Sequence, residues 1–323
     1  LSGVNTYTGA TTINAGTLSV SLLANGGANS GIGASTNAAA NLTLGGGTLQ
    51  YTGATASTDR AFTLTAATTS TINVSTAATN LTISSVSVGG AVGVLAKAGP
   101  GTLILTGFNT YPGGTIVNAG TLRLGASPNT LAAGGAVTVN AGGTLDVNTR
   151  TQTVASVVIN SGTLTMTTGT LSVTGNWANN GGLFSAGTGT VTLSGAGAQI
   201  LSGAMTGASA FNILTLATDT TADPSVIFSS DATATTVNIT PPANDTRVWY
   251  NANSFYFFTN INFPGTSTNT IRFRSSTKAA MTGSIDTTAS TAVVGVGTLF
   301  TTELAVGQNI LVGSEVRTVT VIT

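Results

Sequence analysis

The stretch LSGVNTYTGATTINAGTLSV, residues 1–20, returns almost unchanged as LTGFNTYPGGTIVNAGTLRL at residues 105–124, with 12 of 20 positions identical. The tripeptide Gly-Thr-Leu within both copies recurs along the chain, and from Gly101 the next three steps are 19, 23 and 19 residues. Internal periods of about 20 residues are typical of a solenoid, in which each repeat stacks on the next. The repetition therefore predicts a stack of similar coils.

Apolar and polar residues alternate after each of these glycines. Leu18 and Val20 are separated by Ser, and Leu164 and Met166 by Thr, in a pattern that recurs in other repeats. A period of two indicates a strand with one apolar face, and the frequent Thr favours the extended conformation. The Asn-Ala-Gly that precedes several of these strands is turn chemistry, because Asn and Gly tolerate positive φ. The sequence thus predicts an all-β chain whose stacked coils bury a column of Leu and Val.

Composition excludes several classes of protein. Only 6% of the 323 residues are charged and the net charge is zero, so nothing attracts the chain to nucleic acid or to an anionic membrane. The chain has no His and no Cys, which removes Ser-His-Asp and Cys-His catalysis and the usual zinc sites. No cofactor and no metal are expected. Both ends interrupt repeat-like patterns, so we expect a piece of a longer polypeptide with its export signal and anchor elsewhere.

Two stretches resemble known repeats of bacterial surface proteins. GPGTLILTGFNTYPGGTIVNAGTLRLG, residues 99–125, resembles the autotransporter-associated β-strand repeat. LSVTGNWANNGGLFSAGTGTVTLSGAGAQILSG, residues 171–203, resembles a Gly-Asn-Trp-x-Asn-Asn-Gly repeat of giant secreted surface adhesins, especially of the Bacteroidota. These resemblances imply a right-handed parallel β-helix exported to the bacterial cell surface, commonly as the stalk of an adhesin. Neither repeat carries catalytic residues. Tyr7 and Tyr111 occupy equivalent places in the first repeat and are expected to pack in the same way.

The chain is expected to divide into three parts. Residues 1–240 form the β-helix, residues 241–280 an aromatic-rich cap or β extension, and residues 281–323 a small antiparallel β module that is cut short. The last part resembles a small all-β module of surface and phage structural proteins, in which Gly313-Ser314 is the expected hairpin turn.

The most unusual stretch is RVWYNANSFYFFTNINFPGTSTNTIRFR, residues 247–274, which holds eight of the 18 aromatic residues and three of the seven Arg. One interpretation is a recognition surface, since Tyr, Trp and Arg are favoured at interfaces and aromatic faces stack on sugar rings. The interpretation we favour is the core of a closing sheet that caps the solenoid against edge pairing. The candidate binding residues are Arg247, Trp249, Tyr250, Tyr256, Phe258, Arg272 and Arg274.

The carboxylates offer one loose group, Asp219, Asp223 and Asp231. Such a group suits a Ca²⁺ site or a glycosidase pair, but TDTTADPS is also Asp-Pro turn chemistry, which we favour. A polysaccharide-cleaving β-helix enzyme needs several acids and a base on one face, and the clear repeats hold too few charges for that.

The sequence therefore predicts a structural segment of a bacterial extracellular surface protein, a stalk or filament that supports adhesion and has no enzymatic activity. Two alternatives stay open: a glycan- or protein-binding module that uses residues 247–274, and a polysaccharide-cleaving enzyme. The expected partners are other copies or neighbouring domains of the same long chain, or surface glycans. Neither nucleic-acid binding nor membrane insertion of this segment is expected.

Overall fold

The structure is a computed structural model that describes residues 1, 3–85, 87–89, 92–125, 130–218 and 226–239, and by backbone alone residues 247–251, 256–262, 271–275, 309–312 and 315–318. It divides into two compact units. Unit 1 consists of Leu1–Leu171 and Gly181–Leu183, and unit 2 of Ser172–Asn180 and Phe184–Thr323. No helix in the described part of the chain is long and apolar enough to span a membrane.

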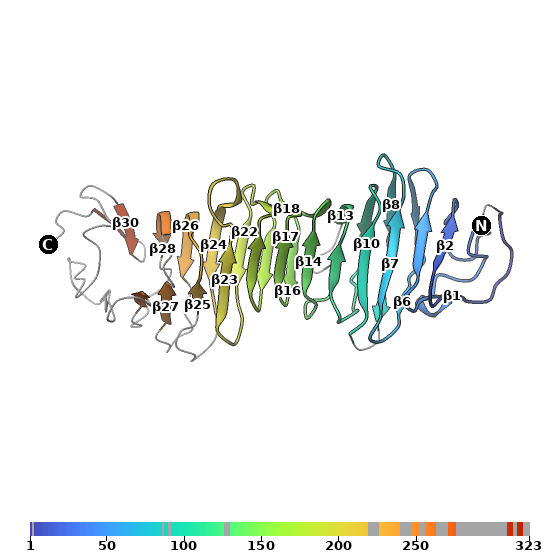
Figure 1. The fold of residues 1–323 in the computed structure, drawn as a ribbon, viewed down its shortest axis with the longest axis horizontal. Helices are drawn as coiled ribbons and strands as arrows, with labels where there is room; N and C mark the ends of the chain where they lie inside the picture. The colour runs from blue at the N-terminus through green and yellow to red at the C-terminus, as the bar shows by residue number, and fades with distance from the viewer. Residues whose placement is uncertain are drawn as a thin grey trace. The chain divides into compact units, whose positions relative to one another are not determined.

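Unit 1 is built from short parallel strands (Figure 1). They are β1 (Thr11–Ile13), β2 (Thr17–Val20), β3 (Leu42–Leu44), β4 (Thr48–Tyr51), β5 (Ala56–Thr58), β6 (Thr63–Leu64), β7 (Thr69–Val74), β8 (Asn80–Ile83), β9 (Val88–Gly89), β10 (Val94–Ala98), β11 (Thr102–Leu105), β12 (Thr115–Val117), β13 (Gly120–Leu124), β14 (Val137–Asn140), β15 (Gly143–Asn148), β16 (Thr151–Val154), β17 (Val157–Asn160) and β18 (Thr163–Met166), with one 3-10 turn, η1 (Ala39–Asn41). Strands β19 (Thr170–Val173) and β21 (Leu183–Ser185) include residues of both units.

Apart from β16, which pairs with β19, the strands of unit 1 stack in three ladders. Their orders are β1-β3-β6-β9, then β2-β4-β7-β10-β12-β14-β17, then β5-β8-β11-β13-β15-β18. The chain visits the ladders in turn, for example through β3, β4 and β5 and then through β6, β7 and β8. Each passage is one coil, and neighbouring strands within the ladders run parallel. The predicted parallel β-solenoid is therefore confirmed.

The predicted alternation produces the core. One in-register column on the third ladder joins Leu81, Leu103, Leu122, Leu145 and Leu164, each no more than 1% exposed. The corners follow the predicted turn chemistry as well, because Gly16, Gly120 and Gly142 have φ of +68°, +60° and +80°. A Cβ at such a φ is strained, so glycine suits these corners. Ser161 takes the same conformation at the corner that follows Asn160, with φ +55°.

The two copies of the opening repeat do not occupy the same sheets. By alignment β1 corresponds to β12 and β2 to β13, yet β2 lies in the ladder of β12, while β13 lies in the next ladder. The second copy is thus advanced by one side of the coil. The repeat specifies a strand, a corner and a second strand, and the lengths of the connections between copies determine which sheet receives them.

Unit 2 holds β20 (Trp177–Asn180), β22 (Thr190–Leu193), β23 (Gln199–Gly203), β24 (Phe211–Leu216), β25 (Val226–Phe228), β26 (Ala232–Ile239), β27 (Arg247–Asn251), β28 (Tyr256–Asn262), β29 (Ile271–Ser275), β30 (Asn309–Val312) and β31 (Glu315–Thr318), with a 3-10 turn, η2 (Gly207–Ser209). Two parallel ladders run β20-β23-β25-β27-β29 and β22-β24-β26-β28. Trp177 is 1% exposed and lies 4.9 Å from Phe184 and 5.4 Å from Phe211 between ring centroids, so an aromatic cluster replaces aliphatic packing there.

The predicted C-terminal parts are described only in places. Strands β27, β28 and β29 lie within residues 241–280 and continue the parallel ladders of unit 2. Strands β30 and β31 pair antiparallel within residues 281–323. Their predicted turn, Gly313-Ser314, lies outside the described residues, as does most of the segment from residue 276 onward. The three domain boundaries and the small module stay predictions.

Candidate binding surface

The predicted binding residues lie on three strands of unit 2, two of them adjacent. Arg247, Trp249 and Tyr250 are in β27, which pairs in parallel with β25 on one side and β29 on the other. Arg272 and Arg274 are in β29. Tyr256 and Phe258 are in β28, in the other ladder, next to β26. The structure therefore brings the first five residues onto adjacent strands and separates them from the last two.

The register divides the set further. Trp249 pairs with Val226, which is fully buried, and with Phe273. Tyr250 pairs with Ile227, which is partly exposed, and with Arg274. Because paired residues of a parallel ladder share a side of the sheet, position 249 continues the buried row and position 250 the outer row.

Tyr256 and Phe258 are in register with buried positions. Their register partners are Ala232 and Ala234, which are 0% and 4% exposed. Tyr250 and Arg274 are in register with the partly exposed Ile227 instead. The choice between a recognition surface and a closing sheet stays a prediction.

Two residues of the outer row escaped the sequence analysis. Ile200 pairs with Ile227, so Ile200, Ile227, Tyr250 and Arg274 form one register row across β23, β25, β27 and β29. The Ile200 residue is 38% exposed, although isoleucine is normally an interior residue. In its strand, QILSG, Gln199 and Leu201 face inward and Ile200 faces outward. An isoleucine at an outward position is the sequence signal that could have identified this row.

The structure describes only one of the three acidic candidate residues. Asp219 and Asp223 lie outside the described residues, and only Asp231 lies within them. Among the residues that the structure describes, no three His, Cys, Asp or Glu side chains gather closely enough to hold a metal ion. A Ca²⁺ site that includes Asp219 and Asp223 stays untested.

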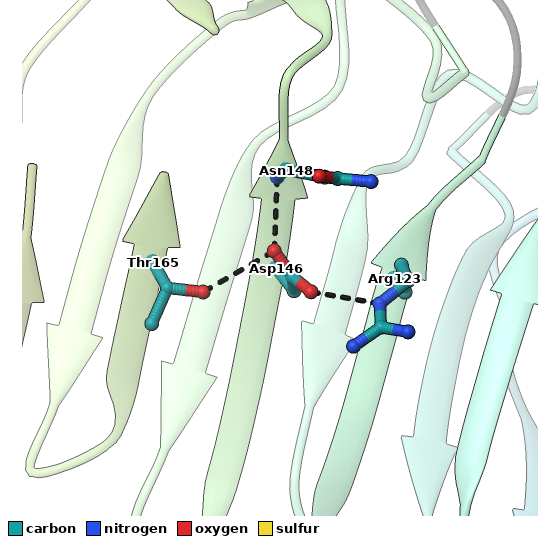
Figure 2. A network of polar contacts seen from close by, with 4 residues as sticks. All are labelled: Arg123, Asp146, Asn148 and Thr165. Carbon is teal, nitrogen blue, oxygen red and sulfur yellow. Dashed lines mark hydrogen bonds and ion pairs between the residues drawn. The ribbon is translucent and has the colours of Figure 1, made fainter. Parts of the chain in front are cut away.

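Unit 1 carries one polar network on its third ladder (Figure 2). Arg123 Nε donates to Asp146 Oδ2 over 2.8 Å, and Asp146 Oδ1 accepts from the backbone N of Asn148 at 2.9 Å and from Thr165 Oγ1 at 3.4 Å. The side chains of Arg123 and Asp146 are 46% and 19% exposed. An exposed ion pair of this kind contributes little to stability.

A buried arginine of unit 1 stabilises the fold. The Arg60 residue is 2% exposed, and its guanidinium donates to Ser35 Oγ and to the carbonyls of Ala24, Asn25, Ala28 and Gly33 at 2.8–3.3 Å. These five hydrogen bonds hold the connection between β2 and β3 against the coil that contains Arg60. Burial lowers the pKa of Arg60, although it stays charged because of the high starting value.

Comparisons with known proteins agree with the architecture. Residues 1–20 and 95–124 match the family described as Passenger-associated-transport-repeat. Over 129 residues the chain is 57% identical to the protein named Adhesin BmaC autotransporter of Brucella suis biovar 1 (strain 1330), a match that covers 39% of this chain and 4% of the adhesin. No solved structure matches the chain.

The predicted resemblance to autotransporter repeats is thereby confirmed, and the second resemblance, at residues 171–203, stays a prediction together with an origin in the Bacteroidota. Both matched segments lie in unit 1 and form consecutive strands of its coils. Two segments of this chain, residues 1–20 and 95–124, are therefore repeats of the kind found in the passenger-associated-transport-repeat family.

Proposed function

We propose that this chain is an extracellular structural segment of a bacterial surface adhesin, a stalk that holds other parts of the same long protein away from the cell. The relative that shares 57% identity is named as an adhesin autotransporter, and this chain covers only 4% of it, so the segment contributes a small part of any such protein. That the whole protein acts in adhesion, as the name of this relative says, is part of the proposal.

One observation carries the proposal: the repeats form a self-supporting stack. The leucine column from Leu81 to Leu164 passes through five in-register strands without an exposed member. Each coil contacts only its neighbours, so a solenoid lengthens by adding coils and needs no central site. Thr and Asn on the outer faces keep it wettable with few charges, and a neutral, regular surface suits a spacer.

Electron microscopy of intact producing cells, with a gold-labelled antibody against residues 240–323, tests this role. We expect label outside the cell in isolated spots, as single stalks would give. Label that runs along regular fibres would contradict a single stalk and indicate a filament of many subunits. Label seen only after the cells are permeabilised would contradict an extracellular role altogether.

A second function, binding by residues 247–274, is favoured by one observation. The register aligns Tyr250 and Arg274 with the exposed Ile200 and with Ile227 on the outer side of one sheet. A spacer has no need of such a row. Loss of cell adhesion in Tyr250→Ala or Arg272→Ala, with the chain still on the surface, would establish binding as a function of this segment.

We propose that the chain is not an enzyme, in keeping with the adhesin name of its relative. Incubation with acidic and neutral polysaccharides, with and without Ca²⁺, should give no new reducing ends. Cleavage that disappears in Asp223→Asn or Asp231→Asn would overturn this proposal.

A further inference from the structure

The two copies of the opening repeat bond in the same way to the coil that follows each of them. The backbone N–H of Asn5 donates to Ser30 O at 3.0 Å. The equivalent N–H of Asn109 donates to Thr130 O at 3.1 Å. Asn5 Nδ2 donates to Gly31 O at 2.9 Å, and Asn109 Nδ2 donates to Thr130 O at 2.7 Å. Because the two copies share these contacts on one side, their other sides can be compared position by position.

On the other side, within the part of the chain that the structure describes, a preceding coil covers the second copy alone. That coil supplies Ser87, whose N–H donates to Asn109 Oδ1 at 3.0 Å and whose carbonyl accepts from Thr110 N at 3.0 Å. In the first copy the equivalent atoms are Asn5 Oδ1 and Thr6 N, and neither has a hydrogen-bond partner among the described residues. The first copy therefore presents an acceptor and a donor that the second copy uses to bind a coil.

The tyrosine of each repeat shows the same difference. Tyr111 is fully buried and its ring stacks 6.5 Å from that of Phe62, whereas Tyr7 is exposed. Gly89 belongs to β9, on the coil between these two rings, and a Cβ added to it would lie 2.5 Å from Tyr111 Cβ. The covering coil thus lacks a side chain where Tyr111 packs, which allows the two rings to meet.

We propose that the open side of residues 1–20 is a docking face for one further coil of the same repeat type. This coil brings a backbone N–H to Asn5 Oδ1 and a carbonyl to Thr6 N. It places a glycine opposite Tyr7 and an aromatic ring behind that glycine, as residues 56–104 do for the second copy. The inference goes beyond the stalk proposal, because it concerns the stacking of coils and holds wherever the protein is located.

The strand edges beside these groups favour a coil over a small ligand. β1 and β2 begin their ladders, so one edge of each has no neighbour among the described strands. Unpaired strand edges bind a further strand through backbone hydrogen bonds. Leu18 of β2 is half-buried, whereas its equivalent Leu122 is fully buried beside Leu103 of β11. A coil that pairs with both edges buries Leu18 as β11 buries Leu122.

The test joins residues 56–104 of this chain to the start of the full chain, so that Ile104 precedes Leu1 as it precedes Leu105. Nitration by tetranitromethane, followed by mass spectrometry, measures the exposure of Tyr7, and Tyr111 is the internal reference. We expect nitration of Tyr7 and amide exchange of Thr6 to be about tenfold slower in this fusion than in the unextended chain, because a stacked coil must open before either reaction.

Two further fusions carry a substitution in the added segment alone. Gly89→Val puts a side chain where Tyr7 has to pack, so Tyr7 should return to the nitration rate of the unextended chain. Val88→Ala is the matched control, because Val88 lies on the same strand and is exposed. It should keep Tyr7 protected. Circular dichroism of each fusion shows whether the added segment forms β-structure.

Three results would overturn the proposal. The first is equal nitration of Tyr7 in the fusion and in the unextended chain. The second is protection that persists in the Gly89→Val fusion, since a specific stack cannot accept that side chain. The third is protection in the unextended chain that increases with protein concentration, which would make the occupant a second copy of the chain. The assay uses purified protein, so its outcome is independent of the antibody labelling of cells.

Discussion

At the scale of single residues, Lys97 departs furthest from the apolar column of unit 1. It pairs with Ile72 and Val117, both fully buried, and is itself 0% exposed. Its ammonium donates to the carbonyls of Ala98, Gly99 and Ala119 at 2.7, 2.8 and 3.0 Å, and burial lowers its pKa to about 8. The three carbonyls satisfy the donor without neutralising its charge.

This lysine makes stability depend on pH. In the unfolded chain its pKa returns to about 10.4, so between pH 8 and that value the unfolded state binds more protons and stability rises with pH. We expect the free energy of unfolding to increase by ~1–2 kcal/mol from pH 8 to 9.5. Urea titrations followed by circular dichroism measure it. Lys97→Met should show no such rise, and an unchanged slope in that variant would assign the effect to other groups.

Tyr7 and Tyr111 show what the second copy of the repeat gains from its place in the stack. Both hydroxyls bond to the threonine four residues later, at 2.9 Å to Thr11 and 3.3 Å to Thr115, as expected of equivalent positions. Tyr111 is 0% exposed and stacks 6.5 Å from Phe62, whereas Tyr7 is 42% exposed. The local bonding is a property of the repeat, and the burial is a property of the neighbouring coils.

The two tyrosines therefore form a matched pair for mutation. Tyr111→Ala should lower the free energy of unfolding by ~3–5 kcal/mol because it opens a cavity, and Tyr7→Ala by ~1 kcal/mol or less. Since both variants remove the same hydrogen bond, the difference in their urea midpoints reports burial. Equal midpoints would show that Tyr111 is not in the core.

At the scale of strands and corners, an amide ladder joins three coils of unit 1. Asn140 Nδ2 donates to Asn118 Oδ1 over 2.8 Å, and Asn160 Nδ2 donates to Asn140 Oδ1 over 3.2 Å. Each asparagine directly precedes or begins a corner with positive φ. These two hydrogen bonds therefore connect the corners of successive coils, in addition to the backbone hydrogen bonds between their strands.

Asn140 is the central member and should be the most sensitive. Asn140→Ala removes both bonds and should cost ~1–2 kcal/mol, while Asn140→Asp keeps the acceptor for Asn160 and loses the donor to Asn118. Thr138→Ala, on the same strand, is the control and should change stability by ~0.5 kcal/mol or less. A Thr138 effect as large as that of Asn140 would indicate general sensitivity of β14.

The Arg123–Asp146 pair of Figure 2 should matter less than its geometry suggests. The double-mutant cycle of Arg123→Gln and Asp146→Asn should give a coupling energy of ~1 kcal/mol or less, since Arg123 is 46% exposed. Asp146→Ala alone should cost more, because it also removes the acceptor for the backbone N–H of Asn148. A coupling near 3 kcal/mol would show that the pair is shielded from water.

Much of this fold could be predicted from local patterns. Gly-Thr-Leu alternation gave the strands and Asn-Ala-Gly the corners, because both depend on residues adjacent in sequence. The advance of the second repeat by one side of the coil, the five bonds of Arg60 and the row from Ile200 to Arg274 depend on contacts between distant segments. Of the candidate site, the segment was identified in advance, but its division into inner and outer positions required the strand register.

At the scale of the whole molecule, the central claim is that the solenoid is a scaffold. The measurement is adhesion of cells whose parent protein has residues 1–171, most of unit 1, replaced by a passenger solenoid of equal length and unrelated surface, compared with deletion of the same residues. Surface display is checked by antibody in both strains. If the solenoid is a scaffold, the replacement keeps adhesion and the deletion weakens it. Loss of adhesion in the replacement, as complete as in the deletion, would contradict a scaffold and place a specific binding site within these residues.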